Sequence, residues 1–438
     1  MNFETIKSFI LGVLVAVSLL LTFSLWSYQP QNDLLSNKPL VSEEEMDIQG
    51  AKETKKELIQ PTDMIFHSNG APYGFTNPKE VERIYSDMQS WVMYDFSIRN
   101  NVKEPNDDHM VEIVFPEALP MQFLNNLFTL NEDPYLPEWS FKRMYITFSE
   151  DQSQLNVRFE ATRGDEYATV VVNNSRKYDL LYNYVTTHDQ LESLVKVENM
   201  ANEIYVPATP VETYNWSFTT NAIDPNQLVN ALFNNPSLVK RNVSNDEINY
   251  TDGLQGMRID KNKRSMEFYN PYDARNYEQM DLSNLIERSI TSVNEHKGWT
   301  DDYHFWAFRR LDNHITYRMF YEGYPVFSSS DYATIEQMWR ENELYQYTRP
   351  LFSINNQIGA TKATLPSGEE VISLLESGQY ASYEPEKIQD IRVGYQLTHK
   401  ESTAYIMTLE PAWYMNYNGK WIQLKLDKDV LLSEKGRD

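Results

Sequence analysis

The sequence predicts an α+β fold of helices packed on antiparallel sheets, preceded by a single transmembrane helix at the N-terminus. Three observations support this fold class. Residues 9–26 are almost wholly apolar, and no charged side chain occurs between Ser8 and Asn32. In the rest of the chain, amphipathic helices with capping residues alternate with runs of strand pattern. Neighbouring strands are joined by short turns such as Asn418-Gly419, which favours antiparallel pairing over a doubly wound parallel sheet.

The apolar segment is long enough to cross a bilayer. A helix rises about 1.5 Å per residue, so residues 9–26 extend roughly 27 Å, close to the ~30 Å hydrocarbon core. The bulky Leu25 and Trp26 end the segment where cleavage of a signal peptide needs small residues, and the chain has no Cys to acylate. We therefore expect an uncleaved anchor in the cell membrane, with residues 1–8 cytoplasmic and the C-terminal domains extracellular.

Small side chains form a stripe along this predicted helix. Ser8, Gly12 and Ala16 recur every four residues and therefore lie on one face. Such a face lets a second transmembrane helix approach closely, which favours association within the membrane. Small residues are also common in membrane helices that have no partner, so both explanations stay open.

The composition limits the chemistry and the partners. The chain has 39 basic and 63 acidic residues and a net charge of −24, which disfavours binding to nucleic acid. It has no Cys, which excludes disulfides, thiol nucleophiles and zinc sites built on thiolates. Its seven His form no H-E-x-x-H motif, and no P-loop, G-x-S-x-G or G-x-G-x-x-G sequence occurs. We expect no catalytic residue, no cofactor and no bound metal.

The chain divides into a linker and three domains. Residues 27–60 are polar, with an acidic run, and predict a linker. The sequence Pro-Ala-Thr-Pro at 207–210 marks the clearest internal boundary. We therefore expect an N-terminal α+β domain at 61–208, a central one at 209–299 and a C-terminal one at 300–438.

In the N-terminal domain, Asn77-Pro78 is predicted to start a helix whose apolar residues recur at helical spacing. Thr187 and Gln190 form a candidate capping box for a second helix, which would bury the apolar residues of 191–195. Strands are expected at 111–115, 144–148, 155–159 and 168–172.

In the central domain, Asp224 is predicted to cap a helix that has Pro225 at its first position. Another helix, ending near Gly298, is predicted from an apolar face of four residues: Leu282, Leu285, Ile286 and Ile290. Strands are expected at 211–219, 256–259 and 266–269.

The C-terminal domain is predicted to be rich in strands from 303 to 354. Ser367 and Glu370 form the clearest capping box of the chain and predict a helix directly after them. The last strands are expected at 388–397, 404–409 and 421–426.

Two groups of polar residues permit both a structural and a functional explanation. His304 and His314 fall in neighbouring predicted strands and could meet across a hairpin, although partly exposed strand histidines are commoner than metal ligands. The acidic pairs Asp107-Asp108 and Asp301-Asp302 lack the alternate-position ligands of a calcium loop. We expect these pairs in solvated turns.

The sequence resembles a known family along its whole length. The resemblance is carried by six segments, whose order and spacing are those of the YycH family: 4–8, 25–30, 250–258, 268–271, 323–327 and 411–414. Within them, the family-motif positions are Gly253, Asn270, Pro271, Gly323, Tyr324, Pro325, Pro411 and Trp413.

The resemblance implies a bitopic protein of low-GC Gram-positive bacteria, folded outside the membrane in three α+β domains. The family is known as an accessory regulator of the WalK (YycG) sensor histidine kinase, which controls cell-wall metabolism. It acts with a second single-span protein, YycI, so a heterodimer with a YycI-like partner and association of the three span helices are expected. The family has no catalytic residue to carry over.

Two other functions remain open from the residues alone. A membrane-tethered glycan hydrolase would need an Asp/Glu pair about 5–10 Å apart in a polar groove. A solute-binding sensor domain would need an apolar pocket with a few converging polar groups. For a binding function, the aromatic stretches 303–324 and 413–421 offer a partner surface, although most of their side chains are expected in the core.

Overall fold

The structure, a computed structural model, describes residues 15, 18, 42–100, 107–244, 247–260, 264–271, 279–329, 332–340, 343–376, 380, 382–399 and 406–425. Residues Glu43–Asp438 form one compact unit, separate from Met1–Ser42. The predicted span at 9–26 lies outside the described residues except for Val15 and Ser18. Within the described ranges, none of the helices has the length and apolar character needed to cross a membrane.

The first sheet has ten strands, in the order β10-β9-β2-β1-β4-β6-β7-β8-β3-β5. Its strands are β1 (Asp63–Ser68), β2 (Ala71–Phe75), β3 (Val92–Asn100), β4 (His109–Pro120), β5 (Thr129–Leu130), β6 (Ser140–Phe148), β7 (Gln154–Ala161), β8 (Glu166–Asn173), β9 (Leu191–Val197) and β10 (Ile204–Pro207). Their described pairings are antiparallel, apart from the parallel pair of β3 and β5 at one end. The four strands predicted between 111 and 172 are confirmed as parts of β4, β6, β7 and β8.

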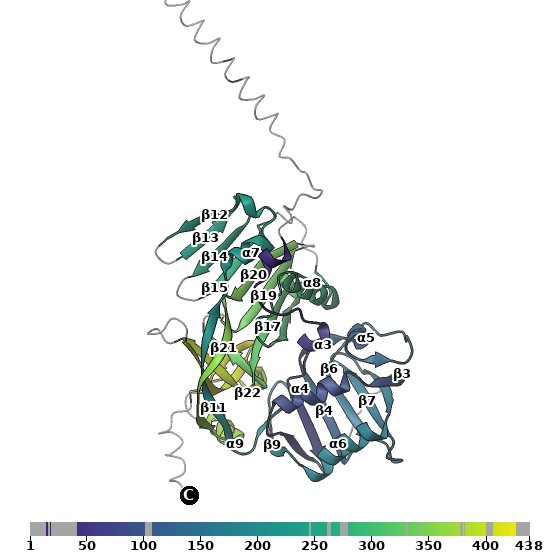
Figure 1. Cartoon of the computed structure of the whole chain (residues 1–438). Coiled ribbons are helices and arrows are strands. Elements are labelled where there is room, and N and C mark those ends of the chain that lie inside the picture. The colour runs from purple at the N-terminus through teal and green to yellow at the C-terminus, as the bar shows by residue number, and fades with distance from the viewer. Residues whose placement is uncertain are drawn as a thin grey trace, which may run out of the picture. The chain divides into compact units, whose positions relative to one another are not determined.

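Two helices cover one face of this sheet (Figure 1). The predicted helix after Asn77-Pro78 is confirmed as α4 (Lys79–Met88), which buries Ile84, Tyr85 and Met88. The Tyr85 ring packs edge-on against Phe115 of β4, with ring centroids 5.7 Å apart. The second helix, α6 (Ser175–Thr187), is joined to α4 by an ion pair between Lys177 and Asp87.

The prediction that a helix begins at Thr187 is wrong, because α6 ends at this residue. The Thr187 hydroxyl donates back to the carbonyl of Asn183, and His188 closes the helix in the left-handed conformation (φ 57°). Residues Leu191–Val197 form β9, which pairs with β2 and β10. Their apolar residues fit strand alternation as well as helical spacing, and pairing with two neighbouring strands decides between them.

The second sheet has fourteen strands. The path runs β12-β13-β14-β15-β20-β19-β17-β18-β22-β23-β11-β21, with β16 beside β17 and β24 beside β23. Its strands are β11 (Val211–Ala222), β12 (Lys240–Val243), β13 (Glu247–Thr251), β14 (Gly256–Asp260), β15 (Ser265–Tyr269), β16 (Tyr303–Arg309), β17 (His314–Tyr321), β18 (Tyr324–Phe327), β19 (Thr334–Arg340), β20 (Glu343–Pro350), β21 (Phe352–Leu365), β22 (Ile388–His399), β23 (Ile406–Tyr417) and β24 (Lys420–Gln423). Strand β18 is parallel to β22, and the other pairings described here are antiparallel.

The remaining helices confirm most of the predicted caps. They are α2 (Glu43–Met46), α3 (Lys55–Leu58), α5 (Leu124–Leu127), α7 (Pro225–Leu232), α8 (Leu282–Glu295) and α9 (Gly368–Glu376). Asp224 caps α7 by accepting from the Asn226 amide. At the start of α9, the Ser367 amide donates to the Glu370 carboxylate and the Glu370 amide donates to the Ser367 hydroxyl, as a capping box requires.

Residues before the first sheet also belong to the compact unit. Ile48, Leu58 and Ile59 are buried in the main apolar cluster, which contains side chains from both sheets. Ala51 forms an isolated antiparallel bridge with Trp299. Part of the segment that the polar composition predicts as a linker therefore packs on the fold. The sheets and helices together confirm the α+β fold class.

Candidate functional site

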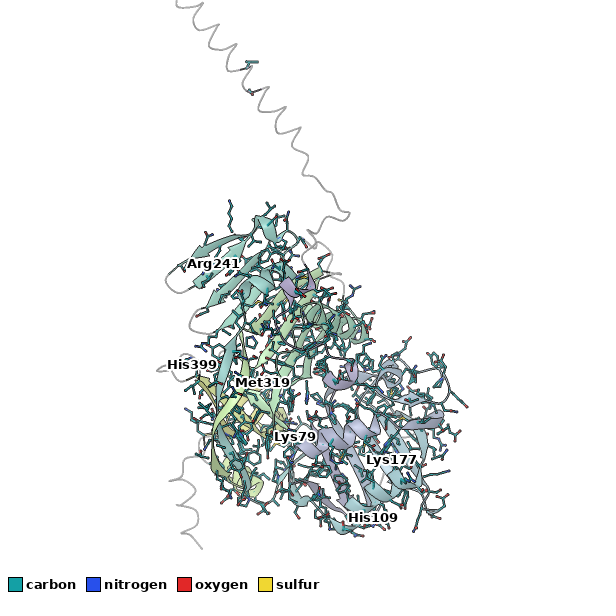
Figure 2. All side chains as sticks on the ribbon, in the orientation of Figure 1. Lys79, His109, Lys177, Arg241, Met319 and His399 are labelled. Atoms are coloured by element: carbon teal, nitrogen blue, oxygen red, sulfur yellow. The ribbon has the colours of Figure 1, made fainter. Side chains whose placement is uncertain are left out.

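The family-motif turn at Gly323 lies against the start of α4. Gly323 has φ +79°, and a Cβ at this position would lie 2.6 Å from the Lys79 nitrogen and 2.7 Å from the Pro78 carbonyl carbon. Figure 2 labels Lys79 at this end of α4. Both the backbone conformation and the close approach therefore require glycine, because any side chain would collide with the helix N-terminus.

Four motif positions line one cleft of about 120 Å³, which we call the tyrosine cleft: Gly323, Tyr324, Pro325 and Trp413. Strand β1 of the first sheet and β22 of the second contribute further lining residues. Trp413 is fully buried, and its indole nitrogen donates to the Pro366 carbonyl at 3.0 Å. Burial raises the pKa of Tyr324, so its hydroxyl stays protonated at physiological pH.

The other motif positions do not line this cleft. Gly253 forms the turn between β13 and β14 with φ +97°, and the Asp252 carboxylate accepts from the Leu254 amide there. The Asn270 amide donates to the Tyr345 carbonyl, and Pro271 follows it before a stretch outside the described residues. Pro411 faces Tyr395 across the β22–β23 pair. Ser8, Gly12 and Ala16 lie outside the described residues.

A wider groove of about 620 Å³ adjoins the tyrosine cleft and shares Thr62 and Arg392 with it. We call it the tryptophan groove after two of its lining residues, Trp306 and Trp421, whose ring centroids are 5.4 Å apart. These residues come from the two aromatic stretches that the sequence marks as a candidate partner surface. Tyr303, Phe305, Tyr317 and Trp413 from the same stretches are buried, as expected for core residues.

Arginine side chains stack on the aromatic rings of the tryptophan groove. The Arg318 guanidinium lies 5.0 Å from the Trp306 ring and 4.5 Å from the Phe327 ring. The Arg392 guanidinium lies 5.7 Å from Trp306 and 5.8 Å from Trp421. Cation–π contacts of this kind hold both the rings and the cations in fixed positions. Trp and Arg are also the side chains most enriched at the energetic centres of protein interfaces.

Arg392 is held by carboxylates from both sheets. Its guanidinium lies 2.5 Å from Asp390 and 3.1 Å from Asp63, which belongs to β1. Burial opposes the charge of Arg392, but the two carboxylates outweigh it and raise the pKa of the guanidinium. The arginine therefore stays charged and joins β22 to the first sheet.

Two carboxylates of the tryptophan groove are paired with basic side chains. Asp390 is paired with Arg392, and Glu336 lies 3.1 Å from His314. Burial acts to raise the pKa of Glu336, but the bonds from His314 and Thr334 prevail and lower it. A general acid of a glycosidase needs the opposite shift. Glu336 therefore does not have the environment of such an acid.

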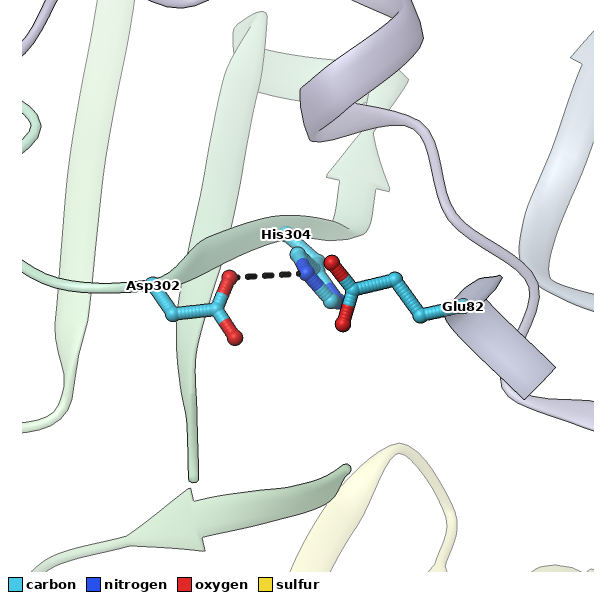
Figure 3. A group of neighbouring side chains, drawn as sticks. All are labelled: Glu82, Asp302 and His304. Carbon is cyan, nitrogen blue, oxygen red and sulfur yellow. Dashed lines mark ion pairs between the residues drawn. The ribbon is translucent and has the colours of Figure 1, made fainter. Parts of the chain in front are cut away.

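A different set of chemical groups meets around His304 (Figure 3). His304 Nε2 lies 2.9 Å from an Asp302 oxygen, and Glu82 of α4 completes a group whose ligand atoms all lie within 4.8 Å of one another. His304 and His314 do not meet, because His304 pairs with Arg318 and His314 with Arg309 near opposite ends of the β16–β17 hairpin. Sequence spacing gave no signal for Glu82, which is far from the other two residues along the chain.

The expected solvated turn at Asp301-Asp302 is wrong for Asp301. Its carboxylate accepts from the Ile354 amide at 2.8 Å, and burial raises its pKa to about 7. Asp302, in contrast, is exposed. One carboxyl of this pair therefore faces the protein and the other reaches its surface.

Comparison with known proteins covers nearly the whole chain. The model of the YycH protein N-terminal domain matches residues 4–205, and that of the YycH protein C-terminal domain matches residues 201–429. A Bacillus subtilis (strain 168) protein described as two-component system WalR/WalK regulatory protein YycH is 24% identical over 465 aligned residues, covering 99% of this chain and 98% of the relative. The crystal structure of YycH from Bacillus subtilis superposes with a TM-score of 0.72 at 22% identity, covering 87% of this chain and 100% of that one, which shows a common fold.

Proposed function

Because the chain belongs to the YycH family, we propose that it is a regulatory protein of a WalR/WalK-type two-component system. The observation that carries this proposal is the match of the family over the whole length, together with the regulatory role in the name of the Bacillus subtilis relative. The protein would act through contacts with other proteins and not through catalysis.

The proposed regulator is anchored by residues 9–26 as a single membrane span. Residues 1–8 would lie in the cytoplasm, and the folded unit would lie outside the cell. The apolar run of 9–26 supports the anchor, and the stripe of Ser8, Gly12 and Ala16 supports packing of this span against other helices. The span helices of the sensor histidine kinase and of a YycI-like protein are the proposed partners within the membrane.

Regulation of this kind has a simple physical basis. A kinase that exchanges between two helix packings shifts toward the packing that binds the regulator more tightly. A difference of a few kcal/mol in binding free energy is enough to change the populations strongly. Close helix contacts at Gly12 and Ala16 would supply such a difference, and no chemical reaction is needed.

We propose the tryptophan groove as the extracellular contact for the YycI-like partner. Trp306, Trp421, Arg318 and Arg392 support this choice, because aromatic and arginine side chains held in place bind at little entropic cost. Trp421 is only partly buried, so a partner side chain could cover its remaining surface.

The test is affinity purification of the full chain from detergent-solubilised membranes, followed by detection of the kinase and of the second bitopic protein. Both should be recovered with the unmodified chain. Trp421→Ala should reduce recovery of the YycI-like protein at least several-fold. Tyr135→Ala is the matched control, because Tyr135 is a large aromatic residue that is 77% exposed and lies outside the groove.

The two parts of this proposal fail separately. Absence of both partners from the purified sample would contradict the regulatory complex itself. Unchanged recovery with Trp421→Ala, when the unmodified chain retains both partners, would contradict only the role of the tryptophan groove.

A further inference from the structure

Glu82, Asp302 and His304 have the donor set of a metal site. One imidazole nitrogen and two carboxylate groups converge from separate parts of the chain, since Glu82 lies on α4, Asp302 directly precedes β16 and His304 lies in β16 (Figure 3). His304 Nε2 and the nearest Asp302 oxygen are 2.9 Å apart. Two ligands at about 2.1 Å from one metal are about 3.4 Å apart at the tetrahedral angles that zinc prefers. The spacing in the structure is therefore only about half an ångström shorter than that of two zinc ligands.

The histidine is held in place before any metal binds. His304 is only 6% exposed, and its ring stacks on Phe320 with centroids 4.4 Å apart. A buried and stacked imidazole has little rotational freedom, so little entropy is lost when its nitrogen binds a cation. This feature distinguishes the group from a cluster of exposed acidic residues, whose side chains stay free and hydrated.

The surrounding charge also favours a cation. The carboxylates of Glu82 and Asp302 and the His304 nitrogen all lie within 4.8 Å of one another. Two negative charges are thus held close together beside one imidazole, and a divalent cation would offset their repulsion.

We propose that Glu82, Asp302 and His304 bind a divalent transition-metal cation of the Zn²⁺ type. The imidazole nitrogen favours such ions over Ca²⁺ and Mg²⁺, which prefer sites made only of oxygen ligands. The cation links α4, which packs on the first sheet, to β16 of the second sheet. Metal binding would therefore stabilise the folded unit, and this inference does not depend on the proposed regulatory function.

Zinc binding to the full chain in detergent, stripped of metal with a chelator, is the test. Isothermal titration with Zn²⁺ should give one site, and saturating Zn²⁺ should raise the midpoint of thermal unfolding. His304→Gln and Glu82→Gln should each weaken Zn²⁺ binding at least about tenfold. His314→Gln is the matched control, because His314 also faces a carboxylate, Glu336, at 3.1 Å but is in no group of three ligands among the described residues.

Three results would overturn the proposal. The first is no binding of Zn²⁺ to the unmodified chain, and the second is binding to Glu82→Gln as tight as to the control. The third is binding of Ca²⁺ or Mg²⁺ as tight as that of Zn²⁺, which would contradict the transition-metal class. Glu82 lies on the surface of α4 and its replacement leaves the core unchanged, so this variant keeps the test valid even where His304→Gln fails to fold.

Discussion

Arg392 of β22 donates a hydrogen bond to Asp63 of β1 over 3.1 Å and so links the two sheets of the folded unit. A second carboxylate, that of Asp390, lies 2.5 Å from the same guanidinium. The ion pair of Arg392 and Asp63 lies where the tyrosine cleft meets the tryptophan groove, and Arg392 lines both. Four predictions follow, from this junction, from the turn at Gly323, from a buried histidine and from the anchor.

Arg392→Ala should lower the free energy of unfolding by about 3 kcal/mol, because it leaves two carboxylates near each other without their cation. Urea unfolding of the full chain in detergent measures this change. Arg309→Ala is the control, since the Arg309 side chain is 59% exposed and forms a surface ion pair with Asp312; its loss should cost less than about 1 kcal/mol. Equal effects of the two substitutions would contradict the structural role of Arg392.

Gly323→Ala should lower the free energy of unfolding by more than the strain of a side chain at positive φ alone would. Its new Cβ would collide with Pro78 and Lys79 at the start of α4. Gly419→Ala is a close match, because Gly419 has the same φ of +79° but nothing within 4 Å of the position of a Cβ. The control should lose about 1–2 kcal/mol in thermal or urea unfolding. Gly323→Ala should lose more, and a loss no larger than that of Gly419→Ala would show that α4 does not approach this turn.

His296 should make the stability depend on pH. It is fully buried beside Tyr347 and Arg349, and burial followed by the Arg349 charge lowers its pKa to about 3. The unfolded chain binds a proton near pH 6.5, while the folded protein does not. The contribution of His296 to the free energy of unfolding is therefore complete above pH 6.5 and is lost as the pH falls toward 3.

The measurement is urea unfolding at pH 6.5 and pH 5, where the unmodified chain should lose about 1–2 kcal/mol through His296. His296→Gln should remove that part of the loss. His399→Gln, at the end of β22 (Figure 2), should keep it. A His296→Gln variant with the full pH dependence of the unmodified chain would show that His296 titrates normally.

Local signals in the sequence predicted the elements well. The capping box of Ser367 and Glu370, the cap at Asp224 and the hairpin turn at Asn418-Gly419 are all confirmed, because each depends on residues within a few positions of one another. The prediction of a helix after Thr187 was wrong because it used only local signals. Residues Leu191–Val197 form β9 because they pair with β2, which lies more than a hundred residues earlier in the chain.

The candidate sites could be predicted only in part. The family resemblance identified Gly323, Tyr324 and Trp413, which line the tyrosine cleft. The aromatic content of two stretches identified Trp306 and Trp421, which line the tryptophan groove. No sequence spacing indicates that Glu82 meets His304, since α4 and β16 come together only in the tertiary structure. The burial of Asp301 beside an exposed Asp302 likewise depends on which side of the segment faces the core.

The central claim is that the span transmits regulation through close helix contacts at Gly12 and Ala16. The double replacement Gly12→Ile with Ala16→Ile adds bulk to this stripe while keeping the segment apolar. Leu14→Ile with Ser18→Ile is the control, because these positions lie on the opposite side of an ideal helix. Each variant of the full chain would be expressed at the same level as the unmodified chain, in cells that have a WalR/WalK-type system.

Transcription of genes controlled by that system is the decisive measurement, read together with membrane insertion of the chain. We predict that the Gly12 and Ala16 replacements change this output by several-fold without changing insertion, and that the control pair leaves it as in the unmodified chain. Output that is unchanged by the stripe variant, or a mature chain in the culture fluid that begins beyond residue 26, would contradict the account.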